Sequence, residues 1–421
     1  MKKISILFLT TFIVLMANAQ QKWTLQQCVD TALANNRNIK QRELNRKTNE
    51  IAYNQARLNL LPNLNASASQ GWSFGRSQIA DGTYQNINAS SNSFGIQSGI
   101  TIFDGLRMKY NIDQRMAELK NSEAALEKIR EDIVLSVSTA YLQVLLNKEL
   151  VSVADNQLQL TQSKIESQRS MVQAGKMAEG ELYELLAQES KETLNKIQAE
   201  NNLKLSLLDL AQILELKDFD QLDIEVPGDL TGLEMNTLNI ETIYQNAMNH
   251  RPEVKSAQYQ LQSSEKNVKI AKSYFFPTLT FGASVGGGSY NSVSTPVSTN
   301  LGFNLSVPIF NKLETKNQVK TAQINVESNK LNLDNTLIEL RKTVQQAYFN
   351  ATAAKARWDA ALKSEIASRE AYRFANQKFE NGKATVYELY QAKSNLANAE
   401  SEVVQAKYEY VFRLKILELL Q

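Results

Sequence analysis

Two long stretches without glycine or proline constrain this chain more than any other feature of its sequence. Residues 106–174 and 313–381 each run for 69 residues without either type, and a glycine follows each stretch. In the first stretch, apolar residues recur mostly at steps of three, four and seven, which predicts a helix with one face turned towards a partner helix. Such a helix would be about 100 Å long. That length exceeds the needs of a globular domain and indicates a spanning function.

The two stretches belong to an internal repeat. Corresponding residues keep a constant spacing, which is 215 residues before the glycine-rich segments and 207 residues after them. The matched residues include Pro62 with Pro277, Tyr141 with Tyr348, and Ala174-Gly175-Lys176 with Asn381-Gly382-Lys383. We therefore expect a first structural repeat at 20–217, a linker at 218–236 and a second structural repeat at 237–421. In each repeat a shorter helix should return along the long one, at 181–216 and at 384–420.

The first 19 residues have the pattern of a cleavable signal peptide. Lys2 and Lys3 precede an apolar run at 4–16, and Ala17-Asn18-Ala19 supplies small residues for cleavage. The alternative is a retained membrane anchor, but this apolar run is short for a span of about 20 residues. Without the two lysines the chain holds 44 basic and 44 acidic residues, so its charge gives no reason to expect nucleic acid as a partner.

Between the helical segments lie two stretches that read as β-hairpins, 63–104 and 278–310. Eleven of the 16 glycines fall in and directly after these stretches, and 278–310 carries no charged residue. Apolar residues alternate with small polar ones, which is the pattern of transmembrane strands with one lipid-facing and one water-facing side. The residues expected to face the pore include Gln97, Thr101, Asn304 and Ser306. A soluble β-sandwich is the alternative, but it explains the missing charges less well.

Four strands cannot close a membrane barrel, because the smallest such barrels need about eight. The strands therefore predict a barrel shared among several copies of the chain. No pattern points to an enzyme, since the chain has no paired catalytic constellation and no phosphate-binding loop. Cys28 lies at helical spacing with other apolar residues and reads as a core residue, and His250 has no ligand cluster around it. We expect no cofactor and no metal.

Several segments resemble the TolC family of outer membrane efflux proteins. They are Leu25 to Asn36, Leu60 to Leu64, Ile100 to Gly105 (ITIFDG), Val307 to Asn311 (VPIFN) and Thr385 to Lys393 (TVYELYQAK). The resemblance spans Trp23 to Leu420 in both repeats. It implies an α+β membrane protein and a homotrimer, in which each protomer gives four strands to a 12-stranded β-barrel. The barrel would lie in outer membrane lipid of a Gram-negative bacterium and continue into a long α-helical coiled-coil periplasmic tunnel.

The resemblance also implies partners and a function. The channel would pass substrates from an inner-membrane pump of the RND, ABC or MFS class, through a periplasmic adaptor (membrane fusion protein), to the exterior. One alternative is a channel for type I protein secretion. Another is a membrane-anchored periplasmic coiled-coil scaffold, which explains the long helices but not the polar strand faces. The substrate and the pump class stay open at this point.

Two groups of site residues follow from the resemblance. The tips that would dock the adaptor are Ala174, Gly175, Lys176, Asn381, Gly382 and Lys383. The tunnel constriction would lie at Glu388 and Gln391, where the family usually has two carboxylates and this chain keeps one. Three copies would place three Glu388 side chains in one ring, which would attract cations. The glycines could also serve only to end helices, and Glu388 could lie on a solvated helix face.

Overall fold

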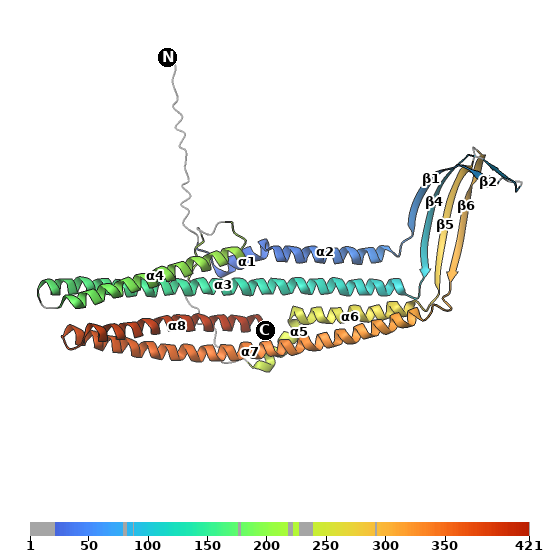
Figure 1. The fold of residues 1–421 in the computed structure, drawn as a ribbon. Coiled ribbons are helices and arrows are strands. Elements are labelled where there is room, and N and C mark those ends of the chain that lie inside the picture. Colours follow the sequence, from blue (N-terminus) through green and yellow to red (C-terminus); the bar gives the residue numbers. More distant parts are fainter. Residues whose placement is uncertain are drawn as a thin grey trace, which may run out of the picture. The chain divides into compact units, whose positions relative to one another are not determined.

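The computed structural model describes residues 22–78, 82–86, 88–175, 178–217, 222–226, 239–290 and 293–420. The predicted signal peptide at 1–19, Lys176 and most of the predicted linker at 218–236 lie outside the described residues. Among the helices of the described residues, none combines the length and the apolar character that a membrane crossing requires. The described part is mostly helical, with a small sheet (Figure 1).

The chain repeats one order of main elements: two helices, an antiparallel strand pair, a long helix and a return helix. The helices are α1 (Leu25–Asn35), α2 (Arg37–Leu58), α3 (Arg107–Gln173), α4 (Glu179–Ile213), α5 (Ile240–His250), α6 (Pro252–Ser273), α7 (Glu314–Glu380) and α8 (Val386–Leu420). The strands are β1 (Asn63–Ser73), β2 (Arg76–Gln78), β3 (Tyr84–Asn86), β4 (Ala89–Phe103), β5 (Thr278–Tyr290) and β6 (Val293–Ser306). The first repeat also has a short additional strand pair, β2 and β3, between its two main strands.

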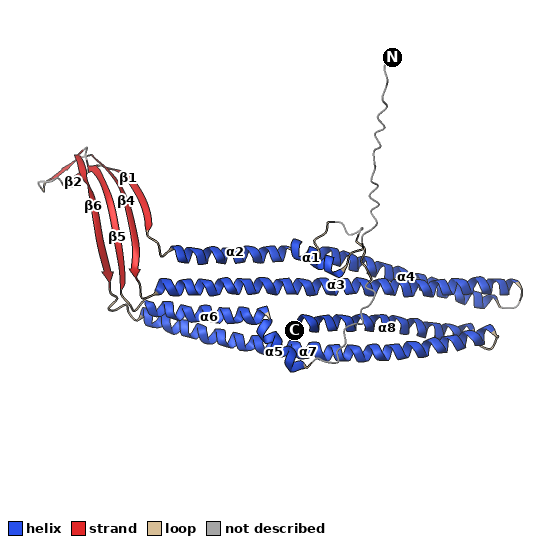
Figure 2. Cartoon of the chain, turned by 180° about the vertical axis from the view of Figure 1, so that it is seen from behind, coloured by secondary structure: helices blue, strands red, loops and turns tan. Residues whose placement is uncertain are grey.

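The chain divides into two compact units. The helical unit has its described residues within 22–37, 130–243 and 343–420, and the strand unit has them within 38–129 and 244–342. Helices α3 and α7 contribute residues to both units. In the helical unit, α4 returns along α3 and α8 returns along α7, as both ribbon views show (Figure 2).

The strand unit contains a four-stranded antiparallel sheet in the order β1-β4-β5-β6. Residues directly opposite each other on antiparallel strands share a face of the sheet. The register therefore collects polar residues into rows on one face, such as Asn65–Gln97–Ser284–Asn300 and Thr101–Thr280–Asn304. The other face carries apolar rows, such as Ile100–Phe281–Phe303. The alternation along each strand thus becomes one polar and one apolar surface.

Both outer edges of this sheet are open in the described part of the chain. β1 pairs only with β4, and β6 pairs only with β5. Each edge therefore presents a row of backbone N–H and C=O groups that no strand of this sheet satisfies. Such an edge is a template for pairing with another chain.

The long helices begin one residue later than the sequence pattern predicts. Leu106 and Leu313, expected as first helical residues, have φ of 66° and 64°, which is the left-handed conformation. A residue in that conformation cannot start a right-handed helix. The turn from strand to helix is made in both repeats by two consecutive left-handed residues, since Gly105 and Lys312 also have positive φ. The apolar leucines extend the helical pattern, which hides this reversal of the backbone.

The return helices also differ slightly from expectation. α4 covers Glu179–Ile213 instead of 181–216, because Glu215 takes a left-handed φ of 54° that ends the helix. α8 begins at Val386 instead of at residue 384, because Thr385 is its cap. Within the predicted linker, Ile224 forms a single parallel bridge with Trp23.

Polar bonds and burial anchor the start of the helical unit to α3. The hydroxyl of Tyr141, which is 1 % exposed, lies 2.6 Å from the carbonyl oxygen of Glu225 and 3.1 Å from that of Trp23. Lys148 on the same helix donates to Asp223 at 2.8 Å. Cys28 is fully buried on α1, as the sequence predicts for a core residue, and burial raises the pKa of its thiol to about 11.

Candidate functional site

The tip between α7 and α8 is a tight helix ending built around a glycine. The Gly382 N–H donates to the Phe379 carbonyl at 2.9 Å, and the Lys383 N–H donates to the Lys378 carbonyl at 2.8 Å. These two bonds are those of a Schellman motif, which needs a left-handed residue directly after the helix. Gly382 supplies it with φ of 66°. A side chain at Gly382 would meet no atom within 4 Å, so only the backbone angle favours glycine there.

The tip after α3 ends in a similar way within the described residues. Gly175 has φ of 69°, and its N–H donates to the Val172 carbonyl at 2.9 Å. Ala174 and Gly175 are both exposed. Lys176, the third predicted docking residue of this tip, lies outside the described residues. Both predicted docking glycines therefore end a long helix and remain accessible at the surface.

An apolar cluster packs between α7 and α8 next to the second tip. Phe379, Val386 and Leu389 are buried together, and Tyr372 and Tyr390 pack against them. The ring of Phe379, the last apolar residue of α7, is part of this core. The cluster ties the end of α7 to the start of α8 and so holds the exposed glycine turn in place.

Glu388 takes part in a capping box at the start of α8. The Thr385 hydroxyl accepts from the Glu388 N–H at 3.2 Å, and the Glu388 carboxylate accepts from the Thr385 N–H at 3.4 Å. Sequence analysis overlooked this role, although Thr-x-x-Glu before an apolar run is its signature. The side chain of Glu388 is exposed. One residue therefore both caps a helix and presents a charge at the surface.

Gln391 lies one turn further along α8, on the same exposed face as Glu388. Its amide donates to Asn395 at 3.2 Å. These three residues, together with Tyr387 and small residues of α7, line a shallow groove of about 510 Å³. The structure thus brings the two predicted constriction residues together on one polar stripe of α8.

The four strand residues expected to face a pore share the polar face of the sheet. Gln97 lies between Asn65 and Ser284 in one row. Thr101 and Asn304 flank Thr280 in another row, and Ser306 is opposite Thr278. A shallow hollow of about 650 Å³ lies against this part of the sheet. No ionisable side chain lines that hollow, so polarity there comes from amides and hydroxyls.

A buried ion pair is another polar feature of the helical unit that the sequence did not reveal. Lys393, in the last position of the TVYELYQAK segment, contacts Glu192 of α4 at 3.1 Å, and both side chains are less than a tenth exposed. Charged residues at heptad core spacing were the available signal. Within the described part of the chain, no group of three His, Cys, Asp or Glu residues could hold a metal ion.

Comparison with known proteins shows the family in which this set of features occurs. The outer membrane efflux protein family matches residues 28–215 and 243–420, which together make up most of the chain. The chain belongs to the outer membrane efflux protein family. As a member, it is an outer membrane protein of a Gram-negative bacterium that acts in efflux or secretion.

Individual relatives are distant in sequence but similar along most of their length. The chain is 23 % identical to the Toxin and drug export protein A of Aggregatibacter actinomycetemcomitans over 92 % of this chain and 83 % of the relative. It is 21 % identical to the Outer membrane protein TolC of Escherichia coli (strain K12) over 94 % and 81 %. The crystal structure of the Campylobacter jejuni CmeC outer membrane channel superposes with a TM-score of 0.80 at 21 % identity, covering 94 % of this chain and 85 % of that one. The likeness extends through both repeats and shows that the fold is shared.

Proposed function

We propose that three copies of this chain form one channel through the outer membrane, with a 12-stranded barrel to which each copy gives four strands. The four-stranded sheet with two open edges carries this proposal. In lipid, unpaired backbone groups at an edge cost several kcal/mol each, so the edges must pair with other copies. The strands alternate in direction, and their number per chain is even. A β6 edge therefore meets the β1 edge of the next copy in antiparallel orientation, like all other pairs.

The two faces of the sheet support the same arrangement. The apolar rows would contact outer membrane lipid, and the polar rows with Gln97, Thr101, Asn304 and Ser306 would line a water-filled pore. A membrane-anchored scaffold would give no reason for a continuous polar face. The long helices α3 and α7 would continue the pore as a periplasmic tunnel. The proposed role is transport, and it includes no catalytic step.

The proposed partners are a periplasmic adaptor and an inner-membrane pump. Docking would use the two predicted tips, Ala174-Gly175-Lys176 and Asn381-Gly382-Lys383. The constriction would lie just after the second tip, where Glu388 and Gln391 share one face of α8. We propose efflux of small compounds as the main task. Type I protein secretion is a second candidate, because the name of one relative includes both toxin and drug export.

The test combines the mass of the assembly with its conductance. The mature protein is purified in a mild detergent, its oligomeric state is measured by light scattering, and the same sample is placed in planar lipid bilayers. We expect a trimer and discrete ionic conductance. A stable, folded monomer would contradict the shared barrel, and a trimer without conductance would favour a scaffold.

A further inference from the structure

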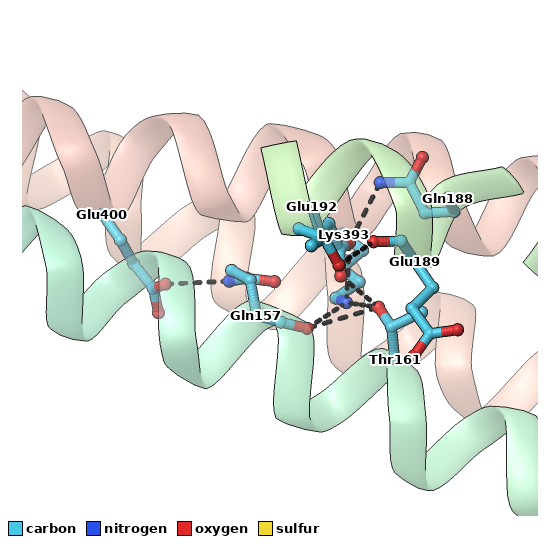
Figure 3. A network of polar contacts seen from close by, with 8 residues as sticks. Gln157, Thr161, Gln188, Glu189, Glu192, Lys393 and Glu400 are labelled. Atoms are coloured by element: carbon cyan, nitrogen blue, oxygen red, sulfur yellow. Dashed lines mark hydrogen bonds and ion pairs between the residues drawn. The ribbon is translucent and has the colours of Figure 1, made fainter. Parts of the chain in front are cut away.

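A buried ion pair joins three helices inside the helical unit (Figure 3). The ammonium group of Lys393 on α8 lies 3.1 Å from a carboxylate oxygen of Glu192 on α4 and 2.8 Å from the backbone carbonyl of Gln157 on α3. It also donates to the hydroxyl of Thr161. The side chains of Lys393 and Glu192 are 6 % and 8 % exposed. The three protons of the ammonium group thus have three acceptors on two partner helices.

The carboxylate of Glu192 is satisfied as completely as the ammonium group. One oxygen also accepts from the Gln188 amide at 3.0 Å, and the other lies 2.5 Å from the Thr161 hydroxyl. Burial lowers the pKa of Lys393, and the charge of Glu192 opposes that shift. A pair of this kind adds little stability compared with well-packed apolar residues, but removal of one partner leaves a buried charge.

The network continues to the fourth helix of the unit. Gln157 donates through its side chain to Glu400 on α8 at 3.2 Å. The other oxygen of Glu400 accepts from Arg369 on α7 at 3.0 Å. One connected set of polar contacts therefore reaches α3, α4, α7 and α8.

The position of Glu192 along its helix shows that the pair is not needed to fill space. Tyr-Glu-Leu occurs near the start of both return helices and ends at Leu185 in α4 and at Leu389 in α8. Seven residues later, α4 has Glu192 and α8 has Leu396, and both positions are buried. Counted from Tyr-Glu-Leu, which recurs at a spacing of 204 residues instead of 207, the second repeat has leucine at the core position where the first repeat places a carboxylate.

A helix interface made only of leucines and an interface with one buried ion pair differ in how strictly they fix the axial position of one helix against the other. Apolar core residues three or four positions apart can exchange partners when one helix slides by about one turn along another, with modest loss of packing. A buried ion pair is satisfied only where Lys393 meets both Glu192 and Thr161, so a slide by one turn leaves two buried charges without partners. Polar residues at core positions of coiled coils set register in this way, at some cost in stability.

We propose that the Lys393–Glu192 ion pair is the register lock of the helical unit: it fixes the axial position of α8 against α3 and α4. The lock sets how far the tip at Gly382 projects relative to the tip at Gly175, since each tip ends one of the locked helical hairpins. The effect of this axial position on adaptor docking rests on the proposed function. The claim that the ion pair fixes the axial position does not.

The first part of the test separates stability from alignment. Glu192→Leu leaves Lys393 buried without its counter-charge and should lower the thermal midpoint clearly. The double variant Glu192→Leu, Lys393→Met removes both charges and should recover the parent's midpoint or exceed it. A double variant as unstable as the single one would mean that the pair contributes ordinary stability, which overturns the proposal.

The second part measures alignment directly in the full-length protein. Cys28→Ala removes the natural thiol, and spin labels are placed at the exposed positions Ser170 of α3 and Gln405 of α8. Labelled chains are mixed with a large excess of unlabelled chains, so that each distance lies within one chain. The parent should give one narrow distance, and the double variant should give a broad or split distribution displaced by about one helical turn of 5.4 Å.

A double variant with the same narrow distance as the parent overturns the register lock. Should that variant not assemble, Glu192→Gln is used, because it keeps the shape of the side chain and removes only the charge. An unbroadened distribution in Glu192→Gln then overturns the proposal equally. The measurement needs neither conductance nor an adaptor, so its outcome is independent of whether the channel proposal holds.

Discussion

Glu388 has two roles at the residue scale that substitution can separate. Glu388→Gln removes the charge, but glutamine also serves in the third position of a capping box, so the thermal midpoint should stay unchanged. Thr385→Ala keeps the charge and removes the cap, at a cost of about 1 kcal/mol in stability. If Glu388 lines the proposed constriction, only Glu388→Gln should reduce cation selectivity. The measurement is the reversal potential of single channels in a salt gradient.

Gln391 supplies the complementary change on the same face of α8. Gln391→Asp should add a second ring of carboxylates one turn from the first and strengthen block by multivalent cations. Asn395, which accepts the Gln391 amide in the structure, loses one hydrogen bond at an exposed site, so assembly should be unaffected. If neither Glu388→Gln nor Gln391→Asp shifts the reversal potential, this face does not line the pore.

Cys28 gives a prediction that depends on pH. The folded-state pKa of its thiol is about 11, above the ordinary value of 9.0. The folded protein therefore keeps a proton that the unfolded chain loses as pH rises above about 9. The contribution of the protonated thiol to the free energy of unfolding is fully present below the unfolded-state pKa of 9.0. It is lost as pH rises towards the folded-state pKa of about 11, so the thermal midpoint should fall between these two values.

Alkylation of the thiol and a matched variant check this prediction. Iodoacetamide should leave Cys28 of the folded protein unmodified at pH 8 and modify it rapidly after denaturation, as read by mass spectrometry. Burial also raises the pKa of Tyr141, so Cys28→Ala should make the alkaline decline less steep without abolishing it. Rapid labelling of the folded protein would show that the thiol is accessible.

At the scale of elements, two glycines with the same backbone angle should differ in their tolerance of alanine. Gly105 and Gly382 have φ of 70° and 66°. A Cβ on Gly105 would lie 2.7 Å from the Cβ of Phe276 and 2.8 Å from the Ser273 carbonyl, whereas Gly382 has open space. Gly382→Ala should therefore cost about 1–2 kcal/mol from the left-handed angle alone, and Gly105→Ala should cost clearly more.

Thermal unfolding of both variants tests this order, and the reverse order would contradict it. Gly382→Ala has a second readout under the proposed function. It should keep the assembly intact and weaken capture by an adaptor, because the turn changes shape while the cluster around Phe379 below it is retained. Export at the parent's level with normal protein abundance would refute a docking role for this tip.

The two faces of β6 should respond differently to charge. Phe303 is exposed on the apolar face and its ring packs against that of Phe281. Phe303→Arg should destabilise insertion into vesicles by about 2–4 kcal/mol near the bilayer midplane. Asn304→Arg, one residue along on the polar face, is the matched control and should be milder. Equal loss of folded protein for both variants would argue for a strand buried on both sides.

The strands and long helices could be predicted because their patterns repeat over many residues. Period two over about ten residues marks the strands, and steps of three and four mark α3 and α7. Local backbone reversals escaped this approach, since Leu106 and Leu313 continue the apolar pattern while their backbones turn left-handed. An apolar residue in a sequence pattern predicts burial, but it carries no information about the φ angle of its backbone.

The candidate site could be predicted only in part, for a related reason. The tip glycines and Glu388 were found because their segments resemble a known family. The partnership of Lys393 with Glu192 joins residues about 200 positions apart, and neither neighbourhood shows which charge will meet which. Such a contact depends on how four helices come together, which a pattern along one chain does not contain.

At the scale of the whole molecule, the proposed assembly makes a prediction about the seam between copies. Cysteine at Ser67 of β1, combined in turn with cysteine at successive positions of β6, should form disulfides between neighbouring chains on the Cys28→Ala background. Crosslinks should appear at alternate positions, because residues on one face of a strand recur with period two. Three crosslinked seams close a covalent ring that runs as a trimer on denaturing gels. Failure of every β6 position to crosslink would contradict the shared barrel.

The two tips of one chain are similar but not the same, and this bears on stoichiometry. Ten residue steps separate Gly175 from Leu185, whereas seven separate Gly382 from Leu389. α8 begins with a capping box, whereas Ala178 gives α4 no side-chain cap. A ring of three chains would therefore present six tips of two alternating kinds. A partner that recognises one kind would bind as three copies per channel, and a partner that tolerates both kinds would bind as six.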